Sequence, residues 1–326
     1  MRPFERGLVP FTGRAALMAA AAFVGGCSSP AAPALKSHGW TARASLPTQR
    51  AGLGAGVINA TLYAVGGYDS ANYWPNRLDA YDPSTDRWTS RAPMPTPRAG
   101  LAVGVIAGRL YAVGGNDQGG VTGHDNESYD PATNSWTTRA PIPTARESPA
   151  AGVVNGILYV VGGYDAGTTI NLGDLTTVEA YDPSTDSWTT KSPMPTARRY
   201  AAAAVIKGIL YVVGGCGNEC PLSVDAYDPA KDQWTTLANM STARLAPAAA
   251  VIGGRLYVMG GTLGAGVPAL NSVESFDPAS NRWQVEPSMP TGRYWLAAGT
   301  VSGVIYAIGG MSVATEFPVT EAFVPF

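Results

Sequence analysis

The sequence predicts an all-β fold made of six repeated units, each with four short strands. The chain has 326 residues, of which 39 are Gly and 26 are Pro. Residues of these two types interrupt helices and exclude a helical bundle. Hydrophobic residues make up 45% and charged residues 14% of the chain. Disordered chains have the opposite balance, with low hydrophobicity and high charge. The third observation is an internal repeat.

The repeat is marked by a Gly pair that ends an apolar, β-prone segment. The six pairs begin at Gly66, Gly114, Gly162, Gly214, Gly260 and Gly309. An aromatic residue followed by Asp-Pro comes after the first five pairs, at Tyr81, Tyr129, Tyr181, Tyr227 and Phe276. A Trp lies seven residues after each of these aromatics, and an Arg lies ten residues after each Trp. We expect a constant frame, because 33 residues separate each aromatic from the next Gly pair in all five cases.

Four strands can be placed in each unit. A small-residue run such as 99–106 suits a position near a central axis, and the segment 110–113 leads to the Gly pair. The third strand ends at the aromatic residue, where Asp-Pro predicts a turn. The fourth strand carries the Trp and leaves through a Pro-rich exit such as 92–97. Length varies only between the Gly pair and the next aromatic, so each unit has one variable loop. Such units predict a six-bladed β-propeller.

The last unit stops after its third strand, near Phe323. Trp40 and Arg50 are ten residues apart, which is the spacing of every other fourth strand. We therefore predict that Gly39–Leu46 completes the sixth blade and that the N-terminal strand closes the ring. Closure of this kind leaves no unpaired edge inside the blade.

A Gly pair, a Tyr and a Trp seven residues later resemble the kelch repeat. The resemblance extends from Trp40 to Phe326. It implies a propeller over residues 38–326.

The N-terminal residues 1–26 have the pattern of a signal peptide. A basic stretch precedes the apolar segment 15–24, which is shorter than the roughly 20 residues of a membrane-spanning helix. Val24-Gly25-Gly26-Cys27 resembles a bacterial lipobox, which implies lipidation of Cys27; an ordinary signal peptide containing a Cys is the alternative. Residues 28–37 are rich in Ser, Ala and Pro and predict a flexible tether after the lipidated Cys27. We expect an exported lipoprotein, held at the membrane only by its anchor and facing the periplasm or the cell surface.

Several kinds of chemistry are disfavoured. The net charge is −2 and the basic residues are spread at regular intervals, so nucleic acid is not an expected partner. His38 and His124 are the two histidines and lie far apart in the sequence, so no His-based metal site is expected. Kelch repeats also occur in galactose oxidase, whose copper needs ligands that this chain lacks. No cofactor is expected. Cys216 and Cys220 predict a disulfide; a metal pair or redox thiols is the alternative, and it lacks companion ligands.

The regularly spaced arginines allow two interpretations. Sixfold repetition favours a structural role. The kelch domains of ubiquitin-ligase adaptors instead place Arg at this position on a ligand-binding face, together with the residues that follow the Gly pairs. By resemblance, the arginines that carry over are Arg50, Arg98, Arg146, Arg198, Arg244 and Arg293. The positions after the Gly pairs that carry over are Tyr68, Asn116, Tyr164, Cys216, Thr262 and Met311.

Departures from the repeat are expected to gather at one mouth of the channel. The residues after the Arg are Ala-Gly in the first two units, but other units have larger ones. These departures are Glu147, Arg199, Tyr200, Tyr294 and Trp295, and the first variable loop adds Tyr73 and Trp74. Aromatic rings with a few charged groups suit a sugar or a peptide. The alternative is that they fill the end of the channel.

Three functions remain open. The first is a monomeric binding module that holds a protein or a glycan on its loop face. The second is a sugar-modifying enzyme resembling the six-bladed sialic acid mutarotases, for which Glu147 with Arg198 or Arg199 is the only catalytic pair to nominate. The third is a structural component of the cell envelope.

Overall fold

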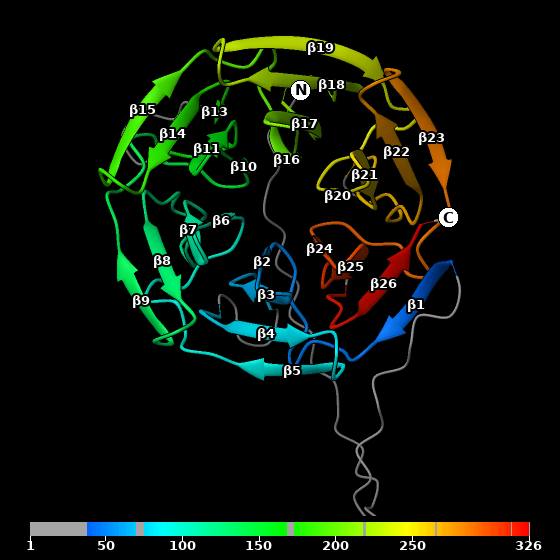
Figure 1. Cartoon of the computed structure of the whole chain (residues 1–326), viewed down its shortest axis with the longest axis horizontal. Helices are drawn as coiled ribbons and strands as arrows, with labels where there is room; N and C mark the ends of the chain where they lie inside the picture. Colours follow the sequence, from blue (N-terminus) through cyan, green and yellow to red (C-terminus); the bar gives the residue numbers. More distant parts are fainter. Residues whose placement is uncertain are drawn as a thin grey trace, which may run out of the picture. The chain divides into compact units, whose positions relative to one another are not determined.

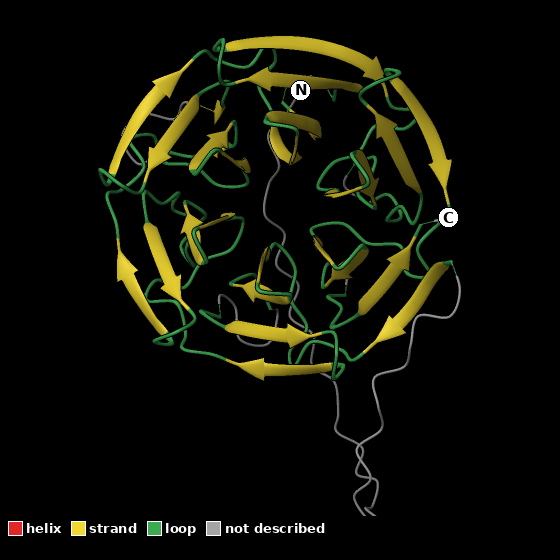
Figure 2. Cartoon of the chain, in the orientation of Figure 1, coloured by secondary structure: helices red, strands yellow, loops and turns green. Residues whose placement is uncertain are grey.

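The structure is a computed structural model that describes residues 38–69, 75–167, 173–217, 220–264, 266–313 and 315–325. These residues form strands, turns and loops and contain no helix (Figure 2). The predicted leader, Cys27 and the tether lie outside them, as do Tyr73 and Trp74. The described part of the chain therefore offers no helix with the length and hydropathy to span a membrane.

Six antiparallel sheets of four strands lie around a common centre (Figure 1). The innermost strands of blades one to six are β2 (Gly54–Ile58), β6 (Ala102–Ile106), β10 (Ala150–Val154), β16 (Arg199–Ile206), β20 (Ala248–Ile252) and β24 (Ala297–Val301). The second strands are β3 (Thr61–Val65), β7 (Arg109–Val113), β11 (Ile157–Val161), β17 (Ile209–Cys216), β21 (Arg255–Met259) and β25 (Val304–Ile308). The third strands are β4 (Leu78–Asp82), β8 (Asn126–Asp130), β14 (Val178–Asp182), β18 (Ser223–Asp228), β22 (Val273–Asp277) and β26 (Thr320–Val324). The outermost strands are β5 (Arg87–Ser90), β9 (Ser135–Thr138), β15 (Ser187–Lys191), β19 (Gln233–Asn239), β23 (Arg282–Glu286) and β1 (Gly39–Arg43). A short hairpin of β12 (Tyr164–Asp165) and β13 (Gly173–Asp174) belongs to the variable loop of blade three. The predicted six-bladed β-propeller is confirmed.

The ring closes through the two ends of the propeller. β1 pairs antiparallel with β26, and Trp40 lies opposite Phe323. The predicted closure is therefore confirmed, although the strand ends at Arg43 rather than Leu46. After Arg43 the Ala44 N–H donates to Asp86 Oδ1 of blade one, 2.9 Å away, and the Leu46 N–H donates to the carbonyl of Pro318 at 2.7 Å.

Each blade is tied to its neighbour by the repeated aromatic pair. Tyr81 and Trp88 are cross-strand partners with ring centroids 5.0 Å apart, and Trp88 Nε1 donates to the carbonyl of Ala44 at 2.9 Å. The Trp residues of the other blades donate in the same way to Ala92, Ala140, Ser192, Ala238 and Pro287. The constant spacing from aromatic to Trp therefore reflects one cross-strand pair and one contact between blades, repeated six times.

The turn after the third strand adds a second link between blades. The side chain of Asp82 accepts the N–H of Ser84 at 2.8 Å, as the Asp-Pro motif predicts. Asp186, at the end of the equivalent turn, has a positive φ of 50°. Its Oδ1 accepts the N–H of Ala140, from the exit of the preceding blade, and the hydroxyl of Tyr181. Asp86, Asn134 and Asp232 accept equivalent pairs of bonds.

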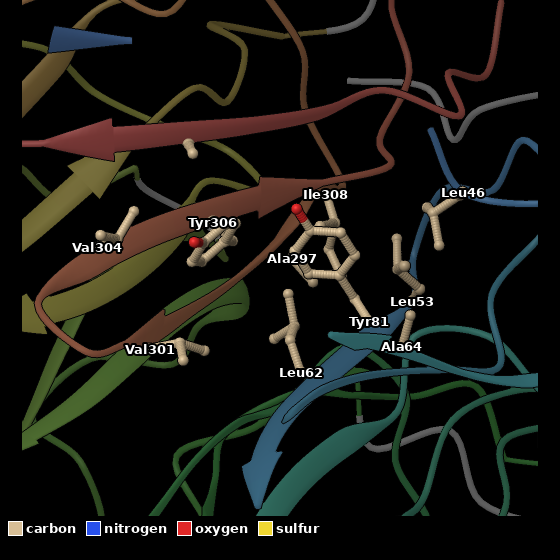
Figure 3. Packing of buried hydrophobic residues seen from close by; sticks show 11 residues of the cluster. Leu46, Leu53, Leu62, Ala64, Tyr81, Ala297, Val301, Val304, Tyr306 and Ile308 are labelled. Carbon is tan, nitrogen blue, oxygen red and sulfur yellow. The ribbon is translucent and has the colours of Figure 1, made fainter. Parts of the chain in front are cut away.

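The core is divided among the spaces between neighbouring blades. Figure 3 shows one of these spaces, where Ala297 and Tyr306 of blade six face Leu62 and Tyr81 of blade one. Close approach near the axis requires small residues. A Cβ on Gly104 would lie 2.5 Å from Leu158 Cδ1 of the next blade.

Candidate functional site

The six regularly spaced arginines are buried in the frame of the propeller. Arg293 is typical: its Nη2 lies 2.8 Å from Glu321 Oε2, and its Nη1 donates to the carbonyl oxygens of Gly309 and Val319 at 3.0 and 2.9 Å. Burial lowers the pKa of Arg293 to about 10, with Glu321 acting in the opposite direction. The other ion pairs are Arg50–Asp79, Arg98–Glu127, Arg146–Glu179, Arg198–Asp225 and Arg244–Glu274.

Burial and ion pairing favour the structural role of the six arginines over contact with a ligand. Each is at most 1% exposed, and its charge is already paired with a carboxylate. The structural role that the sixfold repetition favoured accounts for all of them. The acidic partners were missed, although each lies two residues before the repeated aromatic, as Glu179 does before Tyr181.

The residue that follows each Arg forms the rim of the channel. Ala51 donates its N–H to the carbonyl of Tyr68 at 2.9 Å, and Tyr68 donates back at 2.7 Å. The same bridge joins Ala99 to Asn116, Glu147 to Tyr164, Leu245 to Thr262, and Tyr294 to Met311. In blade four it belongs to the β-ladder and joins Arg199 to Cys216. The positions after the Gly pairs are thus backbone partners of the residues that follow the arginines, and not of the arginines themselves.

The next residue of each blade belongs to a closed ring of backbone hydrogen bonds, which we call the collar. In the collar each N–H donates to the carbonyl of the preceding blade, at distances of 2.6–3.0 Å. All six residues have a positive φ, between 53° and 63°. The collar consists of Gly52, Gly100, Ser148, Tyr200, Ala246 and Trp295.

Two collar positions carry large aromatic residues. Tyr200 has φ 57° and Trp295 has φ 54°. The left-handed region costs an L-residue about 1–2 kcal/mol, and a bulky residue there is a marked outlier. Strain of this kind is typical of functional sites. The two rings lie together, with centroids 5.7 Å apart, and Tyr294 packs against Trp295 at 5.6 Å.

The collar surrounds a cavity of about 470 Å³ on the axis. This volume lies in the range of ligand pockets, roughly 300–1,000 Å³. The predicted residues that line it are Tyr68, Asn116, Glu147, Tyr200, Trp295 and Met311. The collar residues missed by sequence reasoning are Gly52, Gly100, Ser148 and Ala246. Below the collar, Leu53, Leu101, Pro149 and Leu296 separate this cavity from a smaller one of about 150 Å³ between the innermost strands.

Charged groups lie on one side of the cavity. Burial raises the pKa of Glu147, and the nearby Arg199 acts in the opposite direction. Arg199 Nε lies 3.2 Å from Asp174 Oδ1, and its guanidinium lies over the rings of Tyr164 and Tyr200, at 4.5 and 5.6 Å. Burial, followed by the charge of Glu147, raises the pKa of Tyr200 to about 12.

The remaining predicted groups lie near the rim or are not assembled into a site. Cys216 and Cys220 form a disulfide with their Cα atoms 4.2 Å apart. Thr262 is nearly buried and donates its hydroxyl to the carbonyl of Gly264. Among the described residues, no group of three or more His, Cys, Asp or Glu side chains is placed to hold a metal ion.

Fold and site define a propeller whose channel mouth is built from six equivalent units with unequal side chains. The family model of the KLHDC2/KLHL20/DRC7 Kelch-repeats domain matches residues 34–194, 96–261 and 138–310. The chain therefore belongs to the kelch-repeat family.

Two further comparisons are more limited in what they match. The mouse protein "Influenza virus NS1A-binding protein homolog" is 51% identical over 45 residues, which are 14% of this chain and 7% of that protein. The solved structure of YjhT is similar in fold, with a TM-score of 0.72 and 20% identity over 85% of this chain and 95% of the other.

Proposed function

We propose that the propeller is a binding module that holds a protein or a glycan in the cavity at its mouth. The main support is the pair of bulky residues in the left-handed region, Tyr200 and Trp295, whose rings lie together at the cavity. A glycine at either position would relieve the backbone strain, as it does in blades one and two. An aromatic residue at a strained position favours a role for its ring in binding, and this favours a binding module over a purely structural envelope component.

Binding arrays of glycans and of peptides test this proposal. The full chain is compared with Trp295→Ala and with Val285→Ala, whose parent side chain is 75% exposed on the outermost strand β23. We expect the parent and Val285→Ala to bind the same ligand, and Trp295→Ala to lose it. Equal binding by all three proteins would show that the mouth is not the site.

A sugar-modifying enzyme is the second candidate. General acid–base catalysis needs a carboxyl group whose pKa is shifted toward neutrality, and Glu147 lines the cavity with a raised pKa. The proposed partner is Arg199, because Arg198 is buried against Asp225. Polarimetry on freshly dissolved anomers tests it: Glu147→Gln abolishes any acceleration of mutarotation if Glu147 is catalytic, and an unchanged rate rejects this function.

We propose further that the chain is exported and anchored through a lipid on Cys27, and that it functions as a monomer. The basic, apolar and small-residue order of residues 1–27 supports export, and a disulfide suits an oxidising compartment. In a bacterial host, Cys27→Ser is expected to move the protein from the membrane to the soluble fraction. A protein that stays soluble with its natural Cys27 would contradict the anchor.

A further inference from the structure

We propose that the mouth cavity receives one basic side chain, Arg or Lys, from a protein partner. This inference rests on the proposed binding function and names its ligand. It depends on three features of the described residues: the charge at the cavity, the partly buried aromatic residues that line it, and the apolar residues around its rim.

The charge favours a cation. Glu147 lines the cavity, and no described residue forms a hydrogen bond or an ion pair with its carboxylate. The basic group that acts on Glu147 is Arg199, and it is paired with Asp174 at 3.2 Å. The three groups together leave one negative charge. Because the site is partly desolvated, a carboxylate there gains more from a cationic guest than it would in bulk water.

The aromatic residues favour the same guest. Cations bind over the faces of Trp and Tyr within about 6 Å of the ring centre. Arg199 demonstrates this at the edge of the cavity, where its guanidinium lies 4.5 Å from the centre of the Tyr164 ring. Tyr200 and Trp295 line the cavity itself, and each is only partly buried. A guest side chain can therefore stack on these rings while its charge reaches Glu147.

The rim favours a polypeptide as the source of that side chain. Four large hydrophobic side chains of the described residues are exposed, and three of them lie in variable loops next to the rim: Val121, Leu263 and Val313. Thr262 precedes Leu263, and Met311 lies two residues before Val313; both are backbone partners of the rim residues Leu245 and Tyr294. Exposed aliphatic groups around a cavity suit the apolar neighbours of a basic residue in a protein chain.

Calorimetric titration of the full chain tests the inference. The probes are an acetylated and amidated pentapeptide with a central arginine between glycines, the same peptide with citrulline, and neutral monosaccharides. Citrulline has the shape of arginine without its charge. We expect the arginine peptide to bind at least about fivefold more tightly than the citrulline peptide, with an affinity that falls as salt is added.

The variants separate charge from packing. Glu147→Gln is expected to remove the preference for arginine, whereas Trp295→Leu weakens both peptides. Glu286→Gln makes the same charge change on the outermost strand β23 and leaves both affinities unchanged. Circular dichroism and the melting temperature show that each variant is folded.

Each alternative outcome has a distinct meaning. Equal affinity for the two peptides overturns the inference. Binding of a neutral sugar that survives Glu147→Gln also overturns it, while the mouth remains a binding site. If no probe and no array ligand binds in a Trp295-dependent manner, the proposed function fails together with the inference.

Discussion

Individual residues at equivalent positions of the six blades perform two different tasks. The buried arginines are the same in every blade and hold the frame. The collar residues have one backbone conformation and different side chains. Comparison between blades therefore separates what the fold requires from what varies within it. At each collar position the backbone must adopt a left-handed conformation. The ring of backbone hydrogen bonds does not require the side chain of Tyr200 or of Trp295.

The collar predicts an unusual order of stability at Tyr200. Tyr200→Ala loses the ring contacts and keeps the strained φ, whereas Tyr200→Gly loses the contacts and relieves the strain. We expect the Gly variant to exceed the Ala variant in free energy of unfolding by about 1 kcal/mol. Urea denaturation measures the difference. A Gly variant less stable than the Ala variant would contradict the strain argument.

The buried arginines predict a rescue. Arg146→Met leaves the carboxylate of Glu179 buried without its partner, which destabilises a protein by about 3–5 kcal/mol. Adding Glu179→Leu removes the unpaired charge, so the double variant is expected to recover much of the lost stability. Chemical denaturation of both variants provides the test. A small effect of Arg146→Met alone would show that the pair does not support the frame.

Among the elements, the turn after the third strand links a blade to the preceding blade. Asp186 and Asp232 each accept a backbone N–H from the preceding blade and the hydroxyl of a Tyr. Asn134 performs the same task in blade two. In blade five Asn281 accepts only the N–H of Ala238, because Phe276 has no hydroxyl to donate.

Acid is expected to weaken these turns. Hydrogen bonds from Tyr181 and Tyr227 hold the pKa values of Asp186 and Asp232 below the ordinary 3.8. In the unfolded chain these carboxyl groups bind protons at a higher pH than in the folded protein. The stabilisation that they give is therefore present above pH 3.8 and is lost as the pH falls through the lowered pKa values. The Asp186→Asn, Asp232→Asn double variant should show a smaller fall in melting temperature between about pH 5 and pH 2. An unchanged pH profile would rule out these two groups.

The strands and blades could be predicted because their residues repeat at fixed spacing. The mouth was harder. Glu147, Tyr200 and Trp295 were found as departures from the repeat, and the structure brings them to one cavity. The collar was missed because its hydrogen bonds join residues about 50 positions apart, such as Gly52 and Gly100. For the arginines, a structural role and a ligand-binding role both stayed open, because spacing alone does not reveal whether a side chain is buried.

The whole molecule is held closed by one strand. β1 pairs with β26 along five residue pairs, and Trp40 stacks on Phe323 at 5.0 Å. The Trp40 indole also donates to Pro287 of blade five, 2.8 Å away. Blade six therefore depends on β1, which lies at the opposite end of the propeller sequence from its other three strands.

Deletion of residues 38–46 is expected to open the ring. β26 would become an unpaired edge, and Leu46 would be lost from the core between blades six and one. We expect a lower melting temperature and faster proteolysis of the last blade. Deletion of residues 28–36, a segment of the same length in the predicted tether, serves as the control. A melting temperature unaffected by the first deletion would show that closure does not depend on β1.

The collar is made only of main-chain atoms, and this separates the shape of the mouth from its chemistry. Replacing a side chain at any of its six positions, by any residue except proline, leaves every donor and acceptor of the ring in place. Related propellers can therefore acquire new ligands one position at a time, without rebuilding the scaffold that presents them. For protein engineering, the same property makes the collar a six-position library in which glycine is the neutral starting residue.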